Sequence, residues 1–239
     1  MGTNICKNCN YPINDEFCSK CGHPVNLKKI NKDYVIREIV DTLFASKGFF
    51  YTTKKILLHP GDSVKYYITE DRSRHVKPVT YLIITALIYA LISHFLKTDF
   101  LAHIEMTEFF TLNHFRMWIV ENRVYSSIII DLYIAFWIKI FFRKSDYNLF
   151  EIFTLMCYLS GIKALLLSAA LIFQAFIHFN LMTASIFILF SYSIWAIGQF
   201  FEKKKVKSYL KAILSYISGG FSMGLILSVA VIIELMMGR

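Results

Sequence analysis

The stretch RSRHVKPVTYLIITALIYALISHFL, from Arg72 to Leu96, decides the fold of this chain. It opens with a basic cluster (Arg72, Arg74, His75 and Lys77) and continues for nineteen residues without Asp, Glu, Lys or Arg. A helix of that length is about 28 Å long, which matches a hydrocarbon core of roughly 30 Å. Lys and Arg before a first span are retained in the cytoplasm. We therefore expect a cytoplasmic head up to Lys77 and a membrane bundle after it.

Composition supports a membrane protein. Hydrophobic residues make up 56% of the 239-residue chain and charged residues 18%, whereas soluble domains have about 45–50% and about 25%. The mean hydropathy is +0.48. The net charge of +9 would suggest nucleic acid in a soluble protein. In a membrane protein, basic cytoplasmic loops facing anionic lipid explain it.

Two C-x-x-C motifs lie in the first 25 residues, Cys6–Cys9 and Cys18–Cys21, with eight residues between them. Two-residue spacing turns both sulfurs of a motif toward one ion, and two motifs complete a tetrahedral set of thiolates. Disulfides are the alternative, but they fit a reducing cytoplasm badly. We expect residues 1–25 to form a zinc ribbon whose four Cys ligands leave no open position, so that the Zn²⁺ is structural.

A ribbon of this size cannot bury a core, so it should be unfolded without metal. Such ribbons dock onto proteins or nucleic acid, or simply cap a chain. Several Lys residues make this one basic, but few aromatic side chains are available to stack on bases. We expect a protein partner here and do not expect nucleic acid.

Residues 26–77 read as a polar linker followed by short amphipathic helices near 34–44, 52–58 and 62–70. Their apolar positions have helical spacing, and basic residues lie on the opposite side. Packing against the bundle and lying along the inner leaflet are both compatible with this pattern.

The head carries motifs that resemble a known family. They are Phe17-Cys-x-x-Cys-Gly22 in the ribbon, then Thr52-Thr53 with Leu57-Leu58-x-Pro60-Gly61, then Tyr67-Ile68, Arg72 and Pro78. The chain resembles an uncharacterised bacterial family in which a zinc ribbon precedes a helical membrane domain of unknown function. Glu70-Asp71-Arg72 stands where that family has Gly-Lys-Arg. The resemblance covers roughly residues 1–95; it implies the architecture and no activity.

The remaining chain predicts four further spans. Residues 97–121 are too polar to cross, and we expect an amphipathic helix there on the outer surface. The apolar run from Ile152 to Phe201 would be about 75 Å long as one helix, so it must turn, and we expect the break at His178–Asn180. The predicted fold is an all-α polytopic membrane protein of about five helices, with residues 78–239 forming the bundle and spans near 78–96, 125–142, 152–179, 181–201 and 212–237.

Loops rich in Lys and Arg alternate along the chain with loops that carry few of them, as expected if the chain crosses the membrane five times. This pattern places the head inside and the C-terminus outside. Small residues form two stripes, Ser160-x-x-x-Ala164-x-x-x-Ser168 and Gly220-x-x-x-Gly224-x-x-x-Ser228. Small side chains let membrane helices approach closely. We expect both faces to meet helices of this chain or of a second copy in a homo-oligomer.

Two charged residues fall inside predicted spans. Asp131 and Lys163 each cost roughly 2.5–3.5 kcal/mol near a helix centre, so each should find a partner. Counting about 1.5 Å per residue places them at depths that differ by roughly 5 Å, within reach of a Lys side chain. We predict an Asp131–Lys163 ion pair, as a structural tie in preference to a transport relay.

No catalytic motif is present: the chain has no H-E-x-x-H, G-x-S-x-G, P-loop or dinucleotide fingerprint. The sequence predicts a non-enzymatic adaptor or sensor in the inner membrane, with the bilayer as one partner. The alternatives are a small transporter or oligomeric pore that uses Asp131 and Lys163, and a membrane-disrupting effector.

Overall fold

The structure is a computed structural model that describes residues 4–6, 9, 11–13, 18–21, 48–96, 110–177 and 182–236. The chain forms two units, Met1–Ala45 and Ser46–Arg239. The helix predicted at 34–44 and the break predicted at His178–Asn180 lie outside the described residues.

The described part of the first unit is a small hairpin. Strand β1 (Asn4–Ile5) pairs with β2 (Pro12–Ile13) in antiparallel register, with Asn4 opposite Ile13. The backbone N–H of Cys6 donates to the carbonyl of Tyr11 at 2.9 Å. Cys6, the first cysteine of the C-x-x-C motif, thus lies directly after β1 and bonds to Tyr11, the residue before β2.

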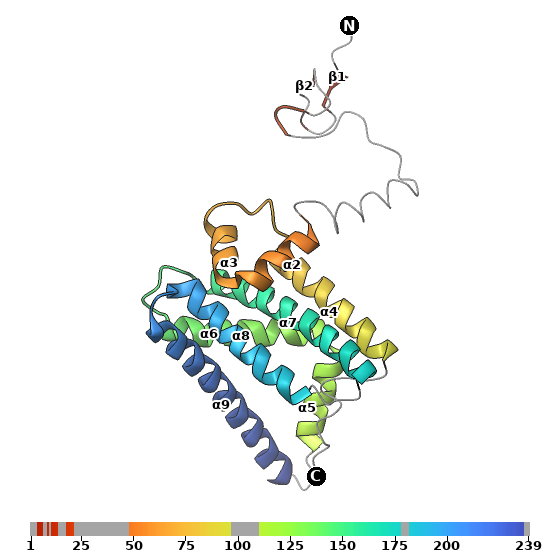
Figure 1. Ribbon diagram of the computed structural model, residues 1–239, viewed down its shortest axis with the longest axis vertical. Helices are drawn as coiled ribbons and strands as arrows, with labels where there is room; N and C mark the ends of the chain where they lie inside the picture. Colours follow the sequence, from red (N-terminus) through yellow and green to blue (C-terminus); the bar gives the residue numbers. More distant parts are fainter. Residues whose placement is uncertain are drawn as a thin grey trace. The chain divides into compact units, whose positions relative to one another are not determined.

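The described part of the second unit is entirely helical (Figure 1). Two short helices come first, α2 (Phe49–Leu58) and α3 (Pro60–Thr69). Proline at the first position of a helix has the required φ and lacks a hydrogen that would go unpaired, which explains why α3 begins at Pro60. The longer helices are α4 (Pro78–Phe95), α6 (Arg123–Phe141), α7 (Leu149–Ile177), α8 (Met182–Glu202) and α9 (Val206–Met236), with the shorter α5 (Phe110–Glu121) before α6.

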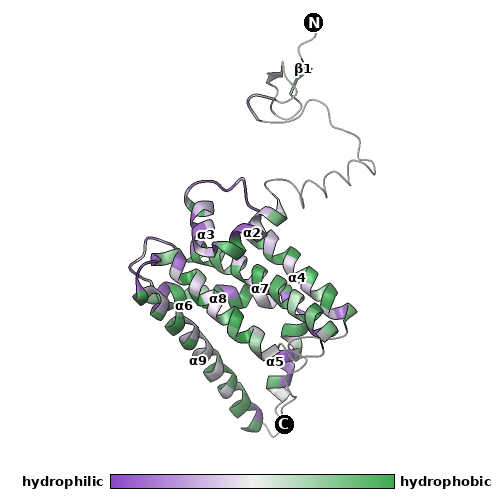
Figure 2. Ribbon diagram, in the orientation of Figure 1, coloured by the Kyte–Doolittle hydropathy of each residue, from purple (hydrophilic) through white to green (hydrophobic). Residues whose placement is uncertain are grey.

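Five of these helices are long and apolar enough to cross a membrane: α4, α6, α7, α8 and α9. Figure 2 shows their hydrophobic residues spread around the helices rather than confined to one stripe, as expected of helices that contact lipid on one side and protein on the other. Half of the most apolar stretch of α7 is buried inside the bundle, whereas 6% of the corresponding stretch of α9 is buried. Helix α7 is therefore the centre of the bundle, while α9 lies at its edge.

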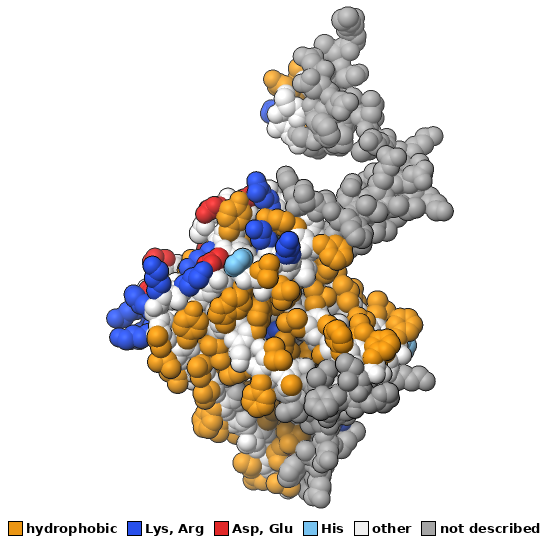
Figure 3. Space-filling model, viewed as in Figure 1, with side chains coloured by type: hydrophobic (Ala, Val, Ile, Leu, Met, Phe, Trp, Pro, Cys, Tyr) orange, Lys and Arg blue, Asp and Glu red, His pale blue; other side chains and the backbone are white. Residues whose placement is uncertain are grey.

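The two ends of the second unit differ in charge. We call the end that carries α2, α3 and the loops 142–148 and 203–205 the basic end, and the end that carries α5 the far end (Figure 1). Lys and Arg side chains gather at the basic end (Figure 3). Among the described residues the basic end holds Lys54, Lys55, Lys65, Arg72, Arg74, Lys77, Arg143, Lys144, Lys203, Lys204, Lys205, Lys207 and Lys211, and the α5 region holds Arg116 and Arg123.

Helix contacts test the two predicted stripes of small residues. On α7, Ser168 is 3% exposed and Ala164 packs against the buried pair Tyr89 and Leu171. On α9, a Cβ added at Gly220 or Gly224 would meet nothing within 4 Å. The α7 stripe therefore meets other helices of this chain. The α9 stripe does not within the described residues.

Candidate functional site

The four cysteines of the C-x-x-C motifs converge in the first unit. Their Sγ atoms all lie within 4.8 Å of one another. The Sγ atoms of Cys6 and Cys21 are 3.5 Å apart, and those of Cys9 and Cys18 are 3.6 Å apart. Sulfurs around a tetrahedral Zn²⁺ with Zn–S bonds of about 2.3 Å are separated by roughly 3.8 Å. The donor set and its spacing therefore fit a single metal ion of this kind.

The thiols of this cluster influence one another. Desolvation raises the pKa of Cys18, but hydrogen bonds from the backbone of Cys21 and Lys20 and from neighbouring thiols outweigh it and lower the pKa below its ordinary value. A backbone hydrogen bond at Tyr11 lowers the pKa of Cys9, but desolvation and the three other thiols raise it to about 12. Four sulfurs at this spacing hold charge unequally, and a bound cation would stabilise all four as thiolates.

A second polar assembly lies at the basic end of the helical unit. We call α2, α3 and the loop 70–77 the collar. Its best-buried link joins α3 to α8: the backbone N–H of Gly61 donates to Oε1 of Gln199 at 2.8 Å, and Nε2 of Gln199 donates to Oδ2 of Asp62 at 3.0 Å. Lys203 pairs with the same carboxylate oxygen at 3.1 Å. Gln199 is 1% exposed, so among the described residues its buried amide is satisfied by the collar.

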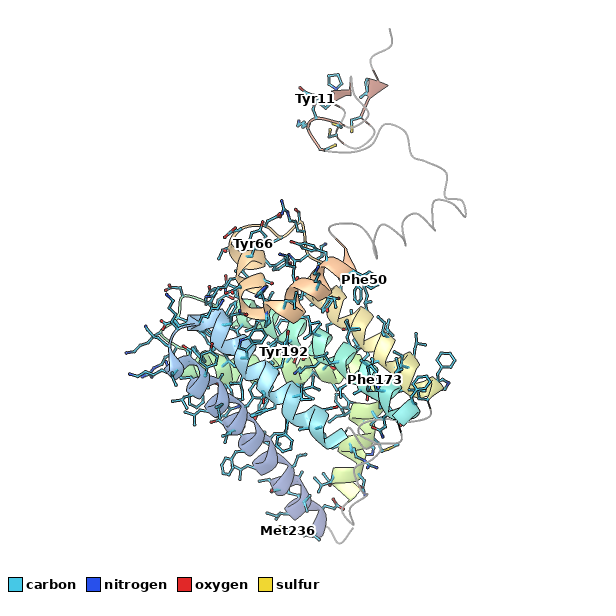
Figure 4. The ribbon with its side chains drawn as sticks, viewed as in Figure 1. Tyr11, Phe50, Tyr66, Phe173, Tyr192 and Met236 are labelled. Carbon is cyan, nitrogen blue, oxygen red and sulfur yellow. The ribbon has the colours of Figure 1, made fainter. Side chains whose placement is uncertain are left out.

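Hydroxyl groups join the collar to α4, α7 and α8. The Thr52 hydroxyl oxygen accepts from the backbone N–H of Val76 at 3.0 Å, and Tyr158 on α7 donates to the carbonyl of Val76 at 2.6 Å. Thr53 and Tyr81 share a hydrogen bond of 3.1 Å. Tyr192, labelled on α8 in Figure 4, donates to the carbonyl of Ile56 at 2.6 Å. The two adjacent Thr residues of the sequence motif thus bond to different segments: Thr52 to the loop 70–77 and Thr53 to α4.

His75 is buried inside the collar. It is 6% exposed, and neither ring nitrogen has a hydrogen-bond partner. Aromatic rings of α2, α3 and α7 surround it, with centroids 5.4 to 6.4 Å away: Tyr51, Tyr66, Tyr67 and Tyr158. Desolvation lowers the pKa of His75, with Asp71 raising it and Lys55 lowering it. Burial among these rings therefore disfavours the protonated form of the His75 imidazole.

This burial predicts that stability falls in mild acid. The unfolded chain binds a proton at His75 near pH 6.5, while the folded chain resists it. Stability is then fully present above about pH 6.5 and is lost as pH falls below that value. Thermal unfolding in a neutral detergent between pH 8 and pH 5 checks this. His75→Phe should flatten the dependence and the exposed His94→Gln should not; equal slopes in all three proteins would refute the assignment.

Asp131 and Lys163 lie on neighbouring helices of the bundle. Asp131, on α6, is 2% exposed and its Oδ1 accepts a hydrogen bond from Ser160 on α7 at 2.5 Å. Lys163 lies one turn further along α7, and its positive charge acts on Asp131 through space. The ion pairs among the described residues do not include the predicted Asp131–Lys163 pair. The observed side-chain contact of Asp131 is with Ser160, and the Asp131–Lys163 ion pair stays a prediction.

Removing the Ser160 hydroxyl should therefore destabilise the bundle. A hydrogen bond to a charged group contributes about 1.5–3 kcal/mol, and Oδ2 of Asp131 already has no partner. Ser160→Ala should lower the unfolding temperature in detergent, whereas Ser168→Ala, which breaks only a bond to its own helix at Ala164, should change it little. Asp131→Asn should restore much of the loss in the Ser160→Ala background; no difference between the two Ser variants would contradict this role.

Glu234 is a buried acid that the sequence analysis passed over. It is 6% exposed, and its Oε2 accepts from the backbone N–H of Thr111 at 2.8 Å. This contact ties the last turn of α9 to the start of α5 at the far end. The signal was available, because Glu234 is an isolated acid within an apolar helix.

One segment of the chain is similar to a known family of proteins. Residues 47–90 match the family model described as "Protein of unknown function (DUF3667)". The matched segment covers α2, α3 and most of α4, so it contains the collar; the thiol cluster lies outside it. No curated protein and no solved structure matches the chain significantly.

Proposed function

We propose that this protein is a non-enzymatic adaptor or sensor of the inner membrane, with a cytoplasmic head folded around structural Zn²⁺. The observation that carries the proposal is the convergence of four Sγ atoms within 4.8 Å. Four protein ligands complete a tetrahedral site, so such a metal has no open position for substrate. A head of this kind supplies a folded surface, and a partner protein is what that surface would bind.

The charge distribution supports a cytoplasmic head. Most of the Lys and Arg residues in the described part of the helical unit lie at the basic end, where α2 begins this unit. Basic residues next to membrane spans are retained in the cytoplasm, where the leaflet is anionic. A cavity of about 400 Å³ at this end is lined by four Lys side chains and two acidic ones, Asp146 and Glu202, so its lining has a net positive charge that suits contact with anionic headgroups. A reducing compartment also keeps the four thiols available for metal.

Metal-dependent recruitment tests the adaptor role. The full-length protein is cross-linked in membranes and purified, from wild type and from a Cys6→Ser/Cys18→Ser variant, with and without a zinc chelator. The proposal predicts a partner that is lost in the variant and on chelation but kept in Cys157→Ser, which alters a buried cysteine of α7. A partner set unaffected by both treatments would overturn the proposal.

A second variant distinguishes a transporter from an adaptor. Asp131→Asn together with Lys163→Met removes both intramembrane charges. An adaptor should keep its metal-dependent partner in this variant, because the head is untouched. A transporter should lose flux in the same variant and keep flux in Cys6→Ser/Cys18→Ser.

A further inference from the structure

The cavity of about 400 Å³ between the loop 142–148 and the start of α9 lies at the basic end, where Lys and Arg side chains gather (Figure 3). Its charged lining consists of Lys144, Asp146, Glu202, Lys205, Lys207 and Lys211. Lys205 pairs with Glu202 at 2.7 Å, so three lysines and one aspartate remain. Lys207 is exposed, and water solvates its charge. These lysines attract anions to the cavity, but they do not by themselves make a binding site.

Ser208 is the buried polar group of this cavity. It lies in the first turn of α9, is 5% exposed and lines the cavity. Three later serines of α9 each donate to a carbonyl of the preceding turn: Ser215, Ser222 and Ser228. Helix α9 has no complete turn before Ser208, and within the described residues its hydroxyl has no hydrogen-bond partner. A buried hydroxyl without a partner is costly, and an acceptor held in the cavity would satisfy it.

The cavity also receives the N-terminus of α9. The first N–H groups of a helix have no carbonyl partner within it, and the helix dipole places partial positive charge there. The N–H of Ser208 donates to the carbonyl of Lys205 at 3.0 Å, whereas the N–H of Lys207 has no partner in the part of the chain that the structure describes. Ser145 lines the cavity from the loop, and its Oγ has no partner either. Hydroxyls, a backbone N–H and ammonium groups around one space are the donors that a phosphate requires.

We propose that this cavity binds a phosphate group at the start of α9. The phosphate oxygens accept from the Ser208 hydroxyl and from the N–H of Lys207, and the ammonium groups of Lys207 and Lys211 lie beside them. The site belongs to the helical unit and does not involve the thiol cluster, so it goes beyond the proposed adaptor role.

An apolar row on α9 begins beside the site. Val206, Leu210 and Leu214 are exposed, and residues four apart share one face of a helix. A phospholipid would place its phosphate at Ser208 and its acyl chains along this row. A soluble phosphate ester would use the cavity alone. The two sources of the phosphate therefore differ in whether acyl chains strengthen binding.

Native mass spectrometry of the full-length protein in a neutral maltoside detergent measures binding. The probes are dioleoylphosphatidylglycerol, dioleoylglycerol, which has the same chains without the phosphate, and glycerophosphate, which has no chains. We expect a phosphorylated probe to bind at least tenfold more tightly than dioleoylglycerol. Tighter binding of phosphatidylglycerol than of glycerophosphate identifies a membrane lipid as the source, and equal or reversed affinities identify a soluble ester. Failure of both phosphorylated probes to bind, or equal binding of dioleoylglycerol, would overturn the proposal.

Matched variants locate the site on α9. Ser208→Ala removes the buried hydroxyl and should weaken the phosphorylated probe about tenfold, because hydrogen bonds to charged groups are among the stronger ones. Ser215→Ala changes a buried serine that donates to the carbonyl of Lys211 in its own helix, and it should retain binding. Lys207→Gln should weaken binding, whereas Lys204→Gln, an exposed lysine outside the cavity lining, should not. Equal effects within either pair would refute the site. If Ser208→Ala does not fold, the lysine pair decides, since both lysines are exposed.

Discussion

Replacing Cys6 and Cys18 together with Ser should reduce the zinc content of the purified protein from about one ion per chain to none. Each substitution removes one thiolate of a four-sulfur set whose Sγ atoms lie within 4.8 Å, and a hydroxyl is a poor ligand for Zn²⁺. Apparent binding free energies of structural zinc in small domains are about 10–16 kcal/mol. Loss of two ligands should thus remove metal and unfold the head together. Elemental analysis and limited proteolysis of the first 45 residues measure both effects.

Cys157→Ser is the matched control for this experiment. Cys157 is a free cysteine, fully buried in α7 and distant in sequence from the C-x-x-C motifs, so its replacement should leave zinc unchanged. Zinc bound at full occupancy by the double variant would show that the four thiols are not the ligands.

Gly61→Ala should lower the unfolding temperature of the helical unit, while Gly220→Ala should not. A Cβ at Gly61 would lie 2.3 Å from the backbone N of Phe200 and 2.6 Å from the backbone C of Gln199. Both atoms belong to the main chain of α8 and cannot rotate away, so α3 must move off α8. Overpacking costs about 1–3 kcal/mol, and the Gly61–Gln199 hydrogen bond adds about 1 kcal/mol when lost.

The two glycines receive the same methyl group in different surroundings. Gly220 faces open space, and exchange of Gly for Ala within a helix stabilises it by up to about 1 kcal/mol. The two variants should therefore shift the thermal unfolding curve in opposite directions in detergent. Equal shifts would show that α3 does not rest on α8 at Gly61.

The five long helices could be predicted from sequence because insertion depends on apolar length, which is a local property. Their ends were less certain. Helix α9 begins at Val206, six residues before the predicted start at 212, because Lys207 and Lys211 are accommodated in its first turns at the basic end. Helix α6 likewise begins at Arg123, two residues before the predicted start at 125. A charge near the end of an apolar run therefore did not mark the end of the helix in either case.

The candidate sites were predictable to different degrees. The thiol cluster follows from C-x-x-C spacing, which is local. The contacts of the collar could not be predicted in this way, because Gly61 and Gln199 are 138 residues apart. Neither segment carries a pattern that predicts contact with the other. The hydrogen bond from Ser160 to Asp131 was not predicted for a related reason: position along a helix can be counted from the sequence, whereas rotation about the helix axis depends on packing. Ser160 and Lys163 are one turn apart on α7, and only the packed structure shows which of them contacts the carboxylate.

Orientation in the membrane is the central claim, because the proposed cytoplasmic head, the proposed reduced state of its thiols and its proposed partner all depend on it. Cysteine labelling of intact cells with a membrane-impermeant maleimide measures it, with labelled peptides mapped by mass spectrometry. Glu121→Cys lies exposed at the far end and Lys204→Cys lies exposed at the basic end. The account predicts labelling at 121 in intact cells and at 204 only after the cells are permeabilised. Labelling at 204 and protection at 121 in intact cells would contradict it.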